Sequence, residues 1–108
     1  MITFDSRGSI HFAAIIGRID VISAPEIKAD LTEYIKQNRS MTHLCADLSA
    51  VDFIDSTGMG VFITIHKTLL KNNQQFSLCC PQEQAKRLLK LSDLAKFFTV
   101  YPNRDEVA

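Results

Sequence analysis

THLCADLSAVDFIDSTGMGVFITIHKTLL, residues 42–70, places a strand-like run directly before a helix-like run. Residues 42–48 have the length and flanking residues of a strand, and residues 49–55 are expected to form the connection that leaves it. From Thr57 to Leu70 apolar residues recur so densely that they predict a helix buried over much of its circumference. A strand that leads into a helix in this way is typical of α/β proteins, so this stretch indicates the fold class.

The residues before this stretch predict a hairpin and a first helix. Apolar runs at 2–5 and 10–16 have the pattern of two strands, and the intervening Ser6-Arg7-Gly8-Ser9 has the composition of a hairpin turn. Ser23-Ala24-Pro25-Glu26 has the form of a capping box with proline in the first turn, so a helix is expected to begin there. The expected core stripe of this helix consists of Ile27, Leu31, Tyr34 and Ile35.

The residues after the stretch complete the predicted fold. Residues 76–80 read as a fourth strand that ends at Pro81, and residues 82–91 as an amphipathic helix. A short helix over 94–97 and a last strand over 98–101 follow. With no repeat or linker between these elements, we predict one α/β domain over residues 1–108. Its central mixed sheet should have about five strands, the later ones mainly parallel, flanked by about four helices.

Composition and charge argue against several classes of function. Hydrophobic residues make up 46% and charged residues 22% of the 108 residues, which is ordinary for a globular domain. The 12 basic residues balance the 12 acidic ones, so no excess positive charge attracts nucleic acid or a membrane surface. The sequence has no run long enough to span a bilayer and no apolar leader segment, so we expect a cytoplasmic protein. The three cysteines are expected as free thiols.

Residues 53–60, Phe-Ile-Asp-Ser-Thr-Gly-Met-Gly, carry the most informative functional signal. They lie where the strand connection meets the helix, and they place two glycines at the helix start. Each glycine costs about 1 kcal/mol relative to alanine inside a helix, so Gly58 and Gly60 need an explanation. Close approach of another backbone or of a partner would explain them, and we predict that they serve partner approach rather than folding. The alternative for Asp55 or Ser56 is that it simply caps the helix.

The segment Asp55-Ser56-Thr57-Gly58-Met59-Gly60 resembles the D-S-[ST]-G-L-G signature of STAS domains that act as anti-anti-sigma factors, also called anti-sigma factor antagonists. Three further segments agree with that family in spacing, namely Gly17-Arg18-Ile19-Asp20, Ser23-Ala24-Pro25 and Asp47-Leu48-Ser49. Met59 replaces the usual leucine with a side chain of similar volume. Arg18 stands where many members carry glutamate, which reverses a surface charge. The resemblance covers nearly the whole chain and implies the STAS fold.

The resemblance implies a bacterial partner-switching protein that regulates transcription, without enzymatic activity or a cofactor. Ser56 is expected to be phosphorylated by a GHKL-type serine kinase that is also an anti-sigma factor, and dephosphorylated by a PP2C-type phosphatase. The unphosphorylated form is expected to bind the kinase and so release the sigma factor. Asp20 has the alternative interpretation of a solvated turn residue at a strand end. The expected partner-binding residues are Asp20, Asp55, Ser56, Thr57, Gly58, Met59 and Gly60.

Other kinds of site have less support in the sequence. Period two places His43, Cys45 and Asp47 on one strand face, which superficially resembles a metal site, but no fourth ligand is identifiable and no metal is predicted. The sequence contains no catalytic constellation and no Walker A motif. Two alternatives stay open, a STAS accessory subunit of a membrane transporter and a small nucleotide-binding enzyme. The sequence leaves open the particular sigma factor and kinase, the output pathway and the oligomeric state.

Overall fold

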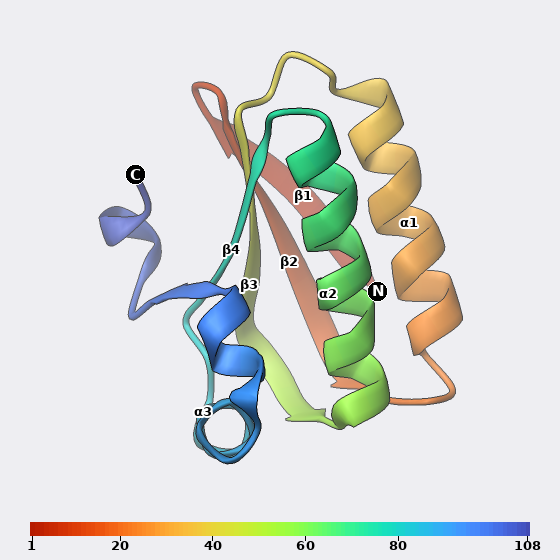
Figure 1. Ribbon diagram of the computed structural model, residues 1–108, viewed down its shortest axis with the longest axis vertical. Helices are drawn as coiled ribbons and strands as arrows, with labels where there is room; N and C mark the ends of the chain where they lie inside the picture. The colour runs from red at the N-terminus through yellow and green to blue at the C-terminus, as the bar shows by residue number, and fades with distance from the viewer.

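The computed structural model describes the backbone of residues 1–108 and the side chains of residues 1–93 and 96–108. The backbone forms one five-stranded sheet with three α-helices and two 3₁₀ helices (Figure 1). The strands are β1 (Ile2–Arg7), β2 (Ile10–Ile19), β3 (His43–Ile54), β4 (Gln75–Cys79) and β5 (Thr99–Tyr101). The helices are α1 (Ala24–Gln37), α2 (Ser56–Lys71), α3 (Glu83–Leu91), η1 (Asp93–Phe97) and η2 (Arg104–Glu106). The predicted α/β class is confirmed, although the fourth expected helix is the 3₁₀ helix η1.

The strand order across the sheet follows the chain, β1-β2-β3-β4-β5. β1 and β2 are antiparallel, with Arg7 opposite Ile10, because only Gly8 and Ser9 connect them. Gly8 has a φ of 64°, the left-handed conformation that two-residue hairpin turns need. The other neighbouring strands are parallel, since helical crossovers join them. The predicted mixed sheet with parallel later strands is therefore confirmed.

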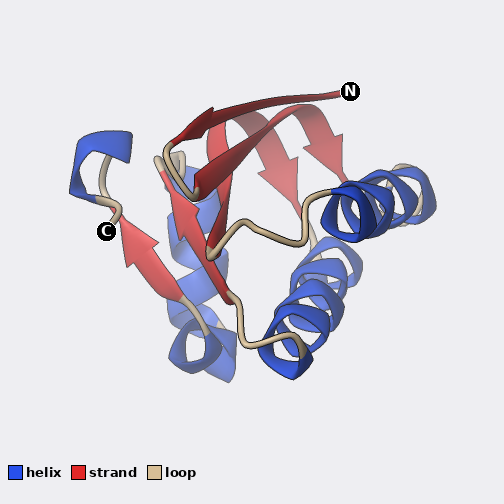
Figure 2. Cartoon of the chain, turned by 90° about the horizontal axis from the view of Figure 1, so that it is seen from above, coloured by secondary structure: helices blue, strands red, loops and turns tan.

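The helices cover one face of the sheet. α1 and α2 lie side by side on this face, and α3 adds to the same core near the end of β3 (Figure 1, Figure 2). α1 buries Ala24, Ile27, Leu31 and Ile35, which recur every three or four residues and so line one stripe. α2 is contacted by both α1 and the sheet, which explains its dense apolar pattern. The main core therefore lies between the sheet and the helices.

The opposite face of the sheet is covered by residues 104–107. A second apolar cluster on this face joins Phe12, Cys45 and Cys79 to Val107. The guanidinium carbon of Arg104 lies 4.5 Å from the centre of the Phe12 ring. We call the surface defined by Phe12, Cys45, Cys79 and Val107 the back face. It has no helix of the α1–α2 layer above it, so its side chains meet the C-terminal segment instead (Figure 2).

β3 is longer than predicted, since it continues to Ile54, and the expectation that residues 49–55 form a connection is wrong. The added residues pair with the end of β2 across two register shifts, and Ile54 lies opposite Ile19. Ala50 and Asp52 are exposed in this part of the strand. The run therefore lacks the continuous apolar pattern by which a buried strand is recognised in sequence.

Candidate functional site

Two strand ends meet at the lower end of the sheet in Figure 1 and bring predicted site residues together. Ile19 of β2 lies opposite Ile54 of β3, and the Asp55 amide donates a 3.2 Å hydrogen bond to the Ile19 carbonyl oxygen. Asp20 and Asp55 are the next residues of the two segments, so both leave the sheet at the same edge. Pairing of β2 with β3 is the physical cause that brings these two aspartates to one edge.

Asp55 is the N-cap of α2, and Ser56 is the first residue of the helix. Extended backbone at Asp55, with φ −108° and ψ −176°, lets its carboxylate accept a 2.8 Å hydrogen bond from the Gly58 amide. The interpretation of Asp55 as a helix cap is thus confirmed. Ser56 and Thr57 are both exposed, so two hydroxyl groups stand at the helix start without being enclosed by the fold.

Asp20 organises the turn that leads from β2 into α1. Its Oδ1 atom accepts hydrogen bonds of 3.1 Å from the Ile22 and Ser23 amides, and its Oδ2 atom accepts one of 3.2 Å from Arg18 Nε. The hydrogen bond from the Ser23 amide is the largest cause that holds the pKa of Asp20 below its ordinary value. Among the side chains that the structure describes, Asp20 accepts no hydrogen bond from Ser56. The turn interpretation is confirmed, and a partner contact stays a prediction.

The predicted capping box at Ser23 is wrong. Ser23 has helical backbone angles, φ −84° and ψ −19°, and its side chain caps no amide of α1. Its hydroxyl instead donates to the Arg18 carbonyl oxygen at 2.8 Å and accepts from the Asp20 amide at 3.0 Å. The hydroxyl is therefore used by the turn rather than by the helix. Pro25 and Glu26 still occupy the first turn of α1, which accounts for a helix that begins where predicted.

The two glycines of α2 have different surroundings. A Cβ atom on Gly58 would lie 2.5 Å from the Ile19 carbonyl oxygen and 2.9 Å from a side-chain carbon of Ile54. Gly58 is thus needed for α2 to pack closely on the strand ends, and its interpretation as a residue that serves partner approach rather than folding is wrong. A Cβ on Gly60 would meet nothing within 4 Å. Partner approach at Gly60 stays a prediction.

The predicted partner-binding residues divide into buried and accessible ones. Met59 is only 1% exposed and packs in the main core, and Gly58 is buried as well. In this conformation the fold covers both residues, so neither is accessible to a partner. Ser56 and Thr57 are exposed, and Gly60 is half-buried. The accessible part of the predicted site is therefore smaller than the sequence motif.

An apolar surface at this end of the sheet was not predicted from the sequence. Val21 and Ile22, in the turn shaped by Asp20, are 66% and 87% exposed although both side chains are large and apolar. A groove of about 330 Å³ between α1 and α2 continues from Thr57 and Gly60 to residues of the first turn of α1. We call Val21, Ile22, Ser56, Thr57 and Gly60 the switch face. Its signal in the sequence is a Val-Ile pair in a turn, where polar residues are usual.

Arg18, which stands where many members of the family carry glutamate, adds a positive charge at this end of the sheet. Its Nε atom lies 3.2 Å from Asp20 Oδ2, and its guanidinium carbon lies 4.3 Å from the centre of the Phe53 ring. The Arg18 side chain is 59% exposed. These two contacts hold one cation beside the turn of the switch face. The Phe53 contact depends on the unexpected extension of β3.

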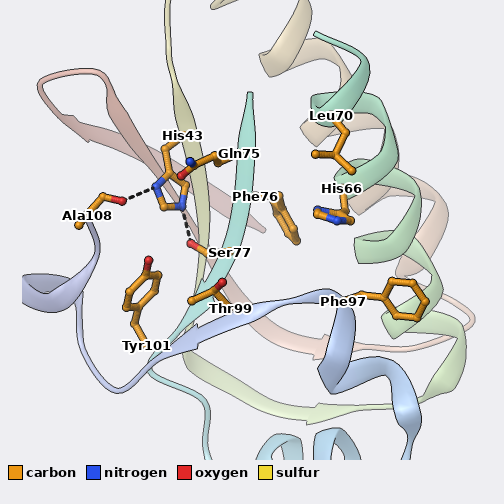
Figure 3. A pocket seen from close by; sticks show the side chains of 10 residues that line it. All are labelled: His43, His66, Leu70, Gln75, Phe76, Ser77, Phe97, Thr99, Tyr101 and Ala108. Atoms are coloured by element: carbon orange, nitrogen blue, oxygen red, sulfur yellow. Dashed lines mark hydrogen bonds between the residues drawn. The ribbon is translucent and has the colours of Figure 1, made fainter. Parts of the chain in front are cut away.

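His43, Cys45 and Asp47 lie on one face of β3, as period two predicts, and all three are buried. His43 does not join the other two in a common site. Its Nε2 atom lies 2.6 Å from Ser77 Oγ, and its Nδ1 atom lies 3.2 Å from the Ala108 carbonyl oxygen (Figure 3). Desolvation is the main cause that lowers the pKa of His43, so its imidazole is neutral at pH 7. This histidine is a hydrogen-bonded core residue.

A mixed five-stranded sheet, helices on one face and an exposed serine beside a capping aspartate are the features of a STAS-type regulatory domain. The STAS domain family model matches residues 2–107, and the chain belongs to this family. The anti-sigma-B factor antagonist of Bacillus subtilis strain 168 is 34% identical over 80 residues, which cover 74% of this chain and 68% of that protein. That of Listeria monocytogenes is 30% identical over 86 residues, covering 80% and 74%.

Solved structures agree with this assignment. An anti-sigma factor antagonist from Mycobacterium paratuberculosis superposes with a TM-score of 0.86 at 24% identity and covers 98% of this chain and 88% of that chain. The unphosphorylated anti-sigma factor antagonist SpoIIAA gives 0.79 at 17% identity, covering 98% and 91%. SpoIIAA is also known in a phosphorylated form, with a TM-score of 0.70 at 17% identity over 98% and 95% of the two chains. At these identities the likeness shows the fold alone.

The same fold occurs in proteins of other kinds. A sulfate transporter family protein from Wolinella succinogenes gives a TM-score of 0.76 at 16% identity, covering 94% of this chain and 83% of that chain. Among the residues that the structure describes, no helix combines the length and apolar character needed to cross a bilayer.

Proposed function

We propose that this protein is a cytoplasmic, non-enzymatic anti-sigma factor antagonist that is switched by phosphorylation of Ser56. The observation that carries the proposal is an exposed serine at the first position of α2, directly after its capping aspartate. The unphosphorylated protein binds a GHKL-type serine kinase that is also an anti-sigma factor, and so releases a sigma factor. A PP2C-type phosphatase restores this form. The names of the curated relatives support the role of antagonist.

The position of Ser56 suits a phosphate that leaves the fold intact. The first turn of a helix has free backbone amides and the positive end of the helix dipole, both of which favour an anion. α2 is a helix of 16 residues whose Asp55 cap bonds to the Gly58 amide rather than to Ser56. Phosphorylation therefore breaks no hydrogen bond of the cap. The modified and unmodified proteins are expected to have similar stability.

The switch face explains why the same phosphate blocks binding. Val21 and Ile22 supply apolar area that a partner can cover, and Ser56 stands at the same end of the sheet. A phosphate of nearly two negative charges on Ser56 loses its hydration in that interface and lies next to Asp55, whose carboxylate has the same sign of charge. Unless the partner supplies a matching cation, the complex is weakened, and each 1.4 kcal/mol corresponds to about tenfold in affinity.

The test uses the cognate kinase, ATP and two neighbouring hydroxyl variants. Wild type and Thr57→Ala should each gain one phosphate, whereas Ser56→Ala should gain none in intact-mass spectrometry. Thr57 is the matched control because it is the next residue, carries a hydroxyl group and is also exposed. In titrations, Ser56→Ala should still capture the kinase, and Ser56→Asp should bind about ten- to a hundredfold more weakly. Phosphate on Thr57 instead of Ser56 contradicts the proposal.

The transporter-accessory alternative has one observation behind it, the fold shared with a sulfate transporter family protein. In that role the domain braces a larger assembly and Ser56 need not be modified. The two functions differ in the same experiment. A cognate partner that binds tightly but transfers no phosphate to Ser56 favours the accessory role.

A further inference from the structure

Two of the three cysteines meet the buried Asp47 on the back face. The ligand atoms of Asp47, Cys79 and Cys80 all lie within 4.8 Å of one another. Asp47 of β3 and Cys79 of β4 are direct partners in the parallel register, which places their side chains next to each other on one face. Strand periodicity alone groups Asp47 with His43 and Cys45. The register selects a different set, contributed by two strands instead of one.

Cys80 joins this set because of its backbone. Successive residues of a strand point to opposite faces, so a regular strand would direct Cys80 away from Cys79. β4 ends at Cys79, and Cys80 has a φ of 58°, a left-handed conformation that is uncommon for a residue other than glycine. The change of direction brings both neighbouring sulfur atoms toward Asp47. Cys45 contacts the Cys79 thiol but lies outside the group of three.

We propose that Asp47, Cys79 and Cys80 form a binding site for one thiophilic divalent cation, of which zinc is the best match. Two sulfur donors and one carboxylate oxygen are a ligand set that zinc accepts, and three protein ligands leave a fourth position for water. Cys79 is buried and Cys80 is half-buried, so the site has an enclosed side and a side open to the surface. A cation can therefore enter past Cys80.

The charges and protons of the proposed site balance. Cysteine thiols are ordinarily protonated at neutral pH. Metal binding therefore forms two metal–sulfur bonds while two protons leave to solvent. Two thiolates, one carboxylate and a divalent cation sum to one negative charge. Arg104 Nε lies 2.7 Å from Asp47 Oδ2 and places a positive charge beside the site, although the same guanidinium also pairs with Asp5.

The contacts of Asp47 leave room for a metal–oxygen bond. Oδ1 accepts a 2.9 Å hydrogen bond from the Ser49 amide, and Oδ2 accepts one from Arg104. Each carboxylate oxygen has a second lone pair that can point at a cation. The two hydrogen bonds fix the orientation of the carboxylate, as partners of metal ligands commonly do.

Titration of the reduced protein with Cd²⁺ and Zn²⁺ tests the proposal. Cd²⁺ should produce thiolate charge-transfer absorption that saturates at one metal per chain, and Zn²⁺ should compete for the same site. Binding of either metal to the metal-free protein should release two protons. Cys80→Ser, at a half-buried position, should fold normally and lose at least about 100-fold in affinity. Cys45→Ser removes a thiol that contacts Cys79 but lies outside the group of three, so it should weaken binding less than Cys80→Ser does.

Circular dichroism of every variant keeps loss of folding apart from loss of binding. Asp47→Asn removes the charged ligand but keeps its shape, and should weaken binding by about tenfold or more. No charge-transfer absorption in the wild type, even with metal in excess, overturns the proposal. So does tight binding that survives in a folded Cys80→Ser protein, because the metal then lies elsewhere. Neither result bears on phosphorylation of Ser56, which lies on a different surface.

Discussion

Aspartates lie beside both the switch face and the back face, but their carboxylates have different partners. At the switch face, Asp20 and Asp55 are half-buried, and each accepts hydrogen bonds from backbone amides two or three residues further on. On the back face, the Asp47 side chain is 8% exposed and pairs with Arg104, which lies 57 positions away in the chain. The first arrangement shapes local backbone and leaves nearby hydroxyls free. The second joins distant segments, so stability depends on it.

Gly58→Ala should have the largest effect, because it tests how closely α2 packs on the strand ends. The added methyl meets the Ile19 carbonyl oxygen at 2.5 Å, a backbone atom that cannot move aside easily. We expect a loss of about 3 kcal/mol in the free energy of unfolding, measured in urea. Gly60→Ala in the same helix meets open space and should gain up to about 1 kcal/mol from helix propensity. Equal losses in both variants would contradict the close-packing explanation.

Arg104→Met compares an ion pair of the back face with one of the switch face. The substitution keeps an apolar chain over Phe12 but leaves the buried Asp47 carboxylate without its cation. We expect it to lower the free energy of unfolding by about 2 kcal/mol. Arg18→Met, which removes an exposed partner of Asp20, should cost less than about 1 kcal/mol. If both arginines contribute equally, the distinction between the two faces fails.

The pH dependence of stability should also depend on Asp47. Desolvation tends to raise its pKa, but hydrogen bonds from the Ser49 amide and Arg104 outweigh this and hold the pKa below its usual 3.8. A carboxyl with a lower pKa in the folded state contributes stability above its unfolded pKa and loses it as the pH falls through the folded value. Wild type should therefore lose stability below about pH 4. Asp47→Asn should lack this part of the loss in denaturation curves at pH 7 and pH 3.

Asp55→Ala should have a small effect on stability, since it removes one cap from a helix that packing already holds. The expected loss is about 1 kcal/mol, seen as a lower Tm. Asp55→Asn keeps an oxygen acceptor for the Gly58 amide and should recover most of it. Ser56→Ala should leave Tm unchanged, because the cap is at the preceding residue. A large loss in Ser56→Ala would mean that the hydroxyl serves the fold and not a partner.

The fold was predictable from the sequence to a large extent because its elements are short and their patterns are distinct. Apolar residues in α1 recur at helical spacing, and a two-residue turn joins the first strands. The end of β3 was not predictable, since its stability comes from pairing with β2 while Ala50 and Asp52 face solvent. Pairing partners of this kind leave little trace in local periodicity.

The motif of the candidate site was predictable from the sequence. Which of its residues pack inside the fold and which are accessible to a partner was not. The sequence places Ser56 after a cap, yet it could not show that Gly58 faces the Ile19 carbonyl oxygen, because that contact joins α2 to the distant strand β2. The exposure of Val21 and Ile22 depends on a turn that hydrogen bonds to Asp20 hold, which residue type alone does not reveal. The thiol set was hidden for a similar reason, since Cys80 reaches Asp47 only through a left-handed backbone angle.

The contact between Arg7 and the C-terminal segment bears on the order of folding. Arg7 donates hydrogen bonds to the carbonyl oxygens of Arg104 and Val107, which lie 97 and 100 positions away. Closing so large a loop is entropically unfavourable until the intervening sheet has formed. We therefore expect the helix-covered core to assemble first and the C-terminal segment to dock last. In pulse-labelling hydrogen exchange, amides of β3 should gain protection before the Val107 amide, which donates to the Arg104 carbonyl oxygen at 3.1 Å.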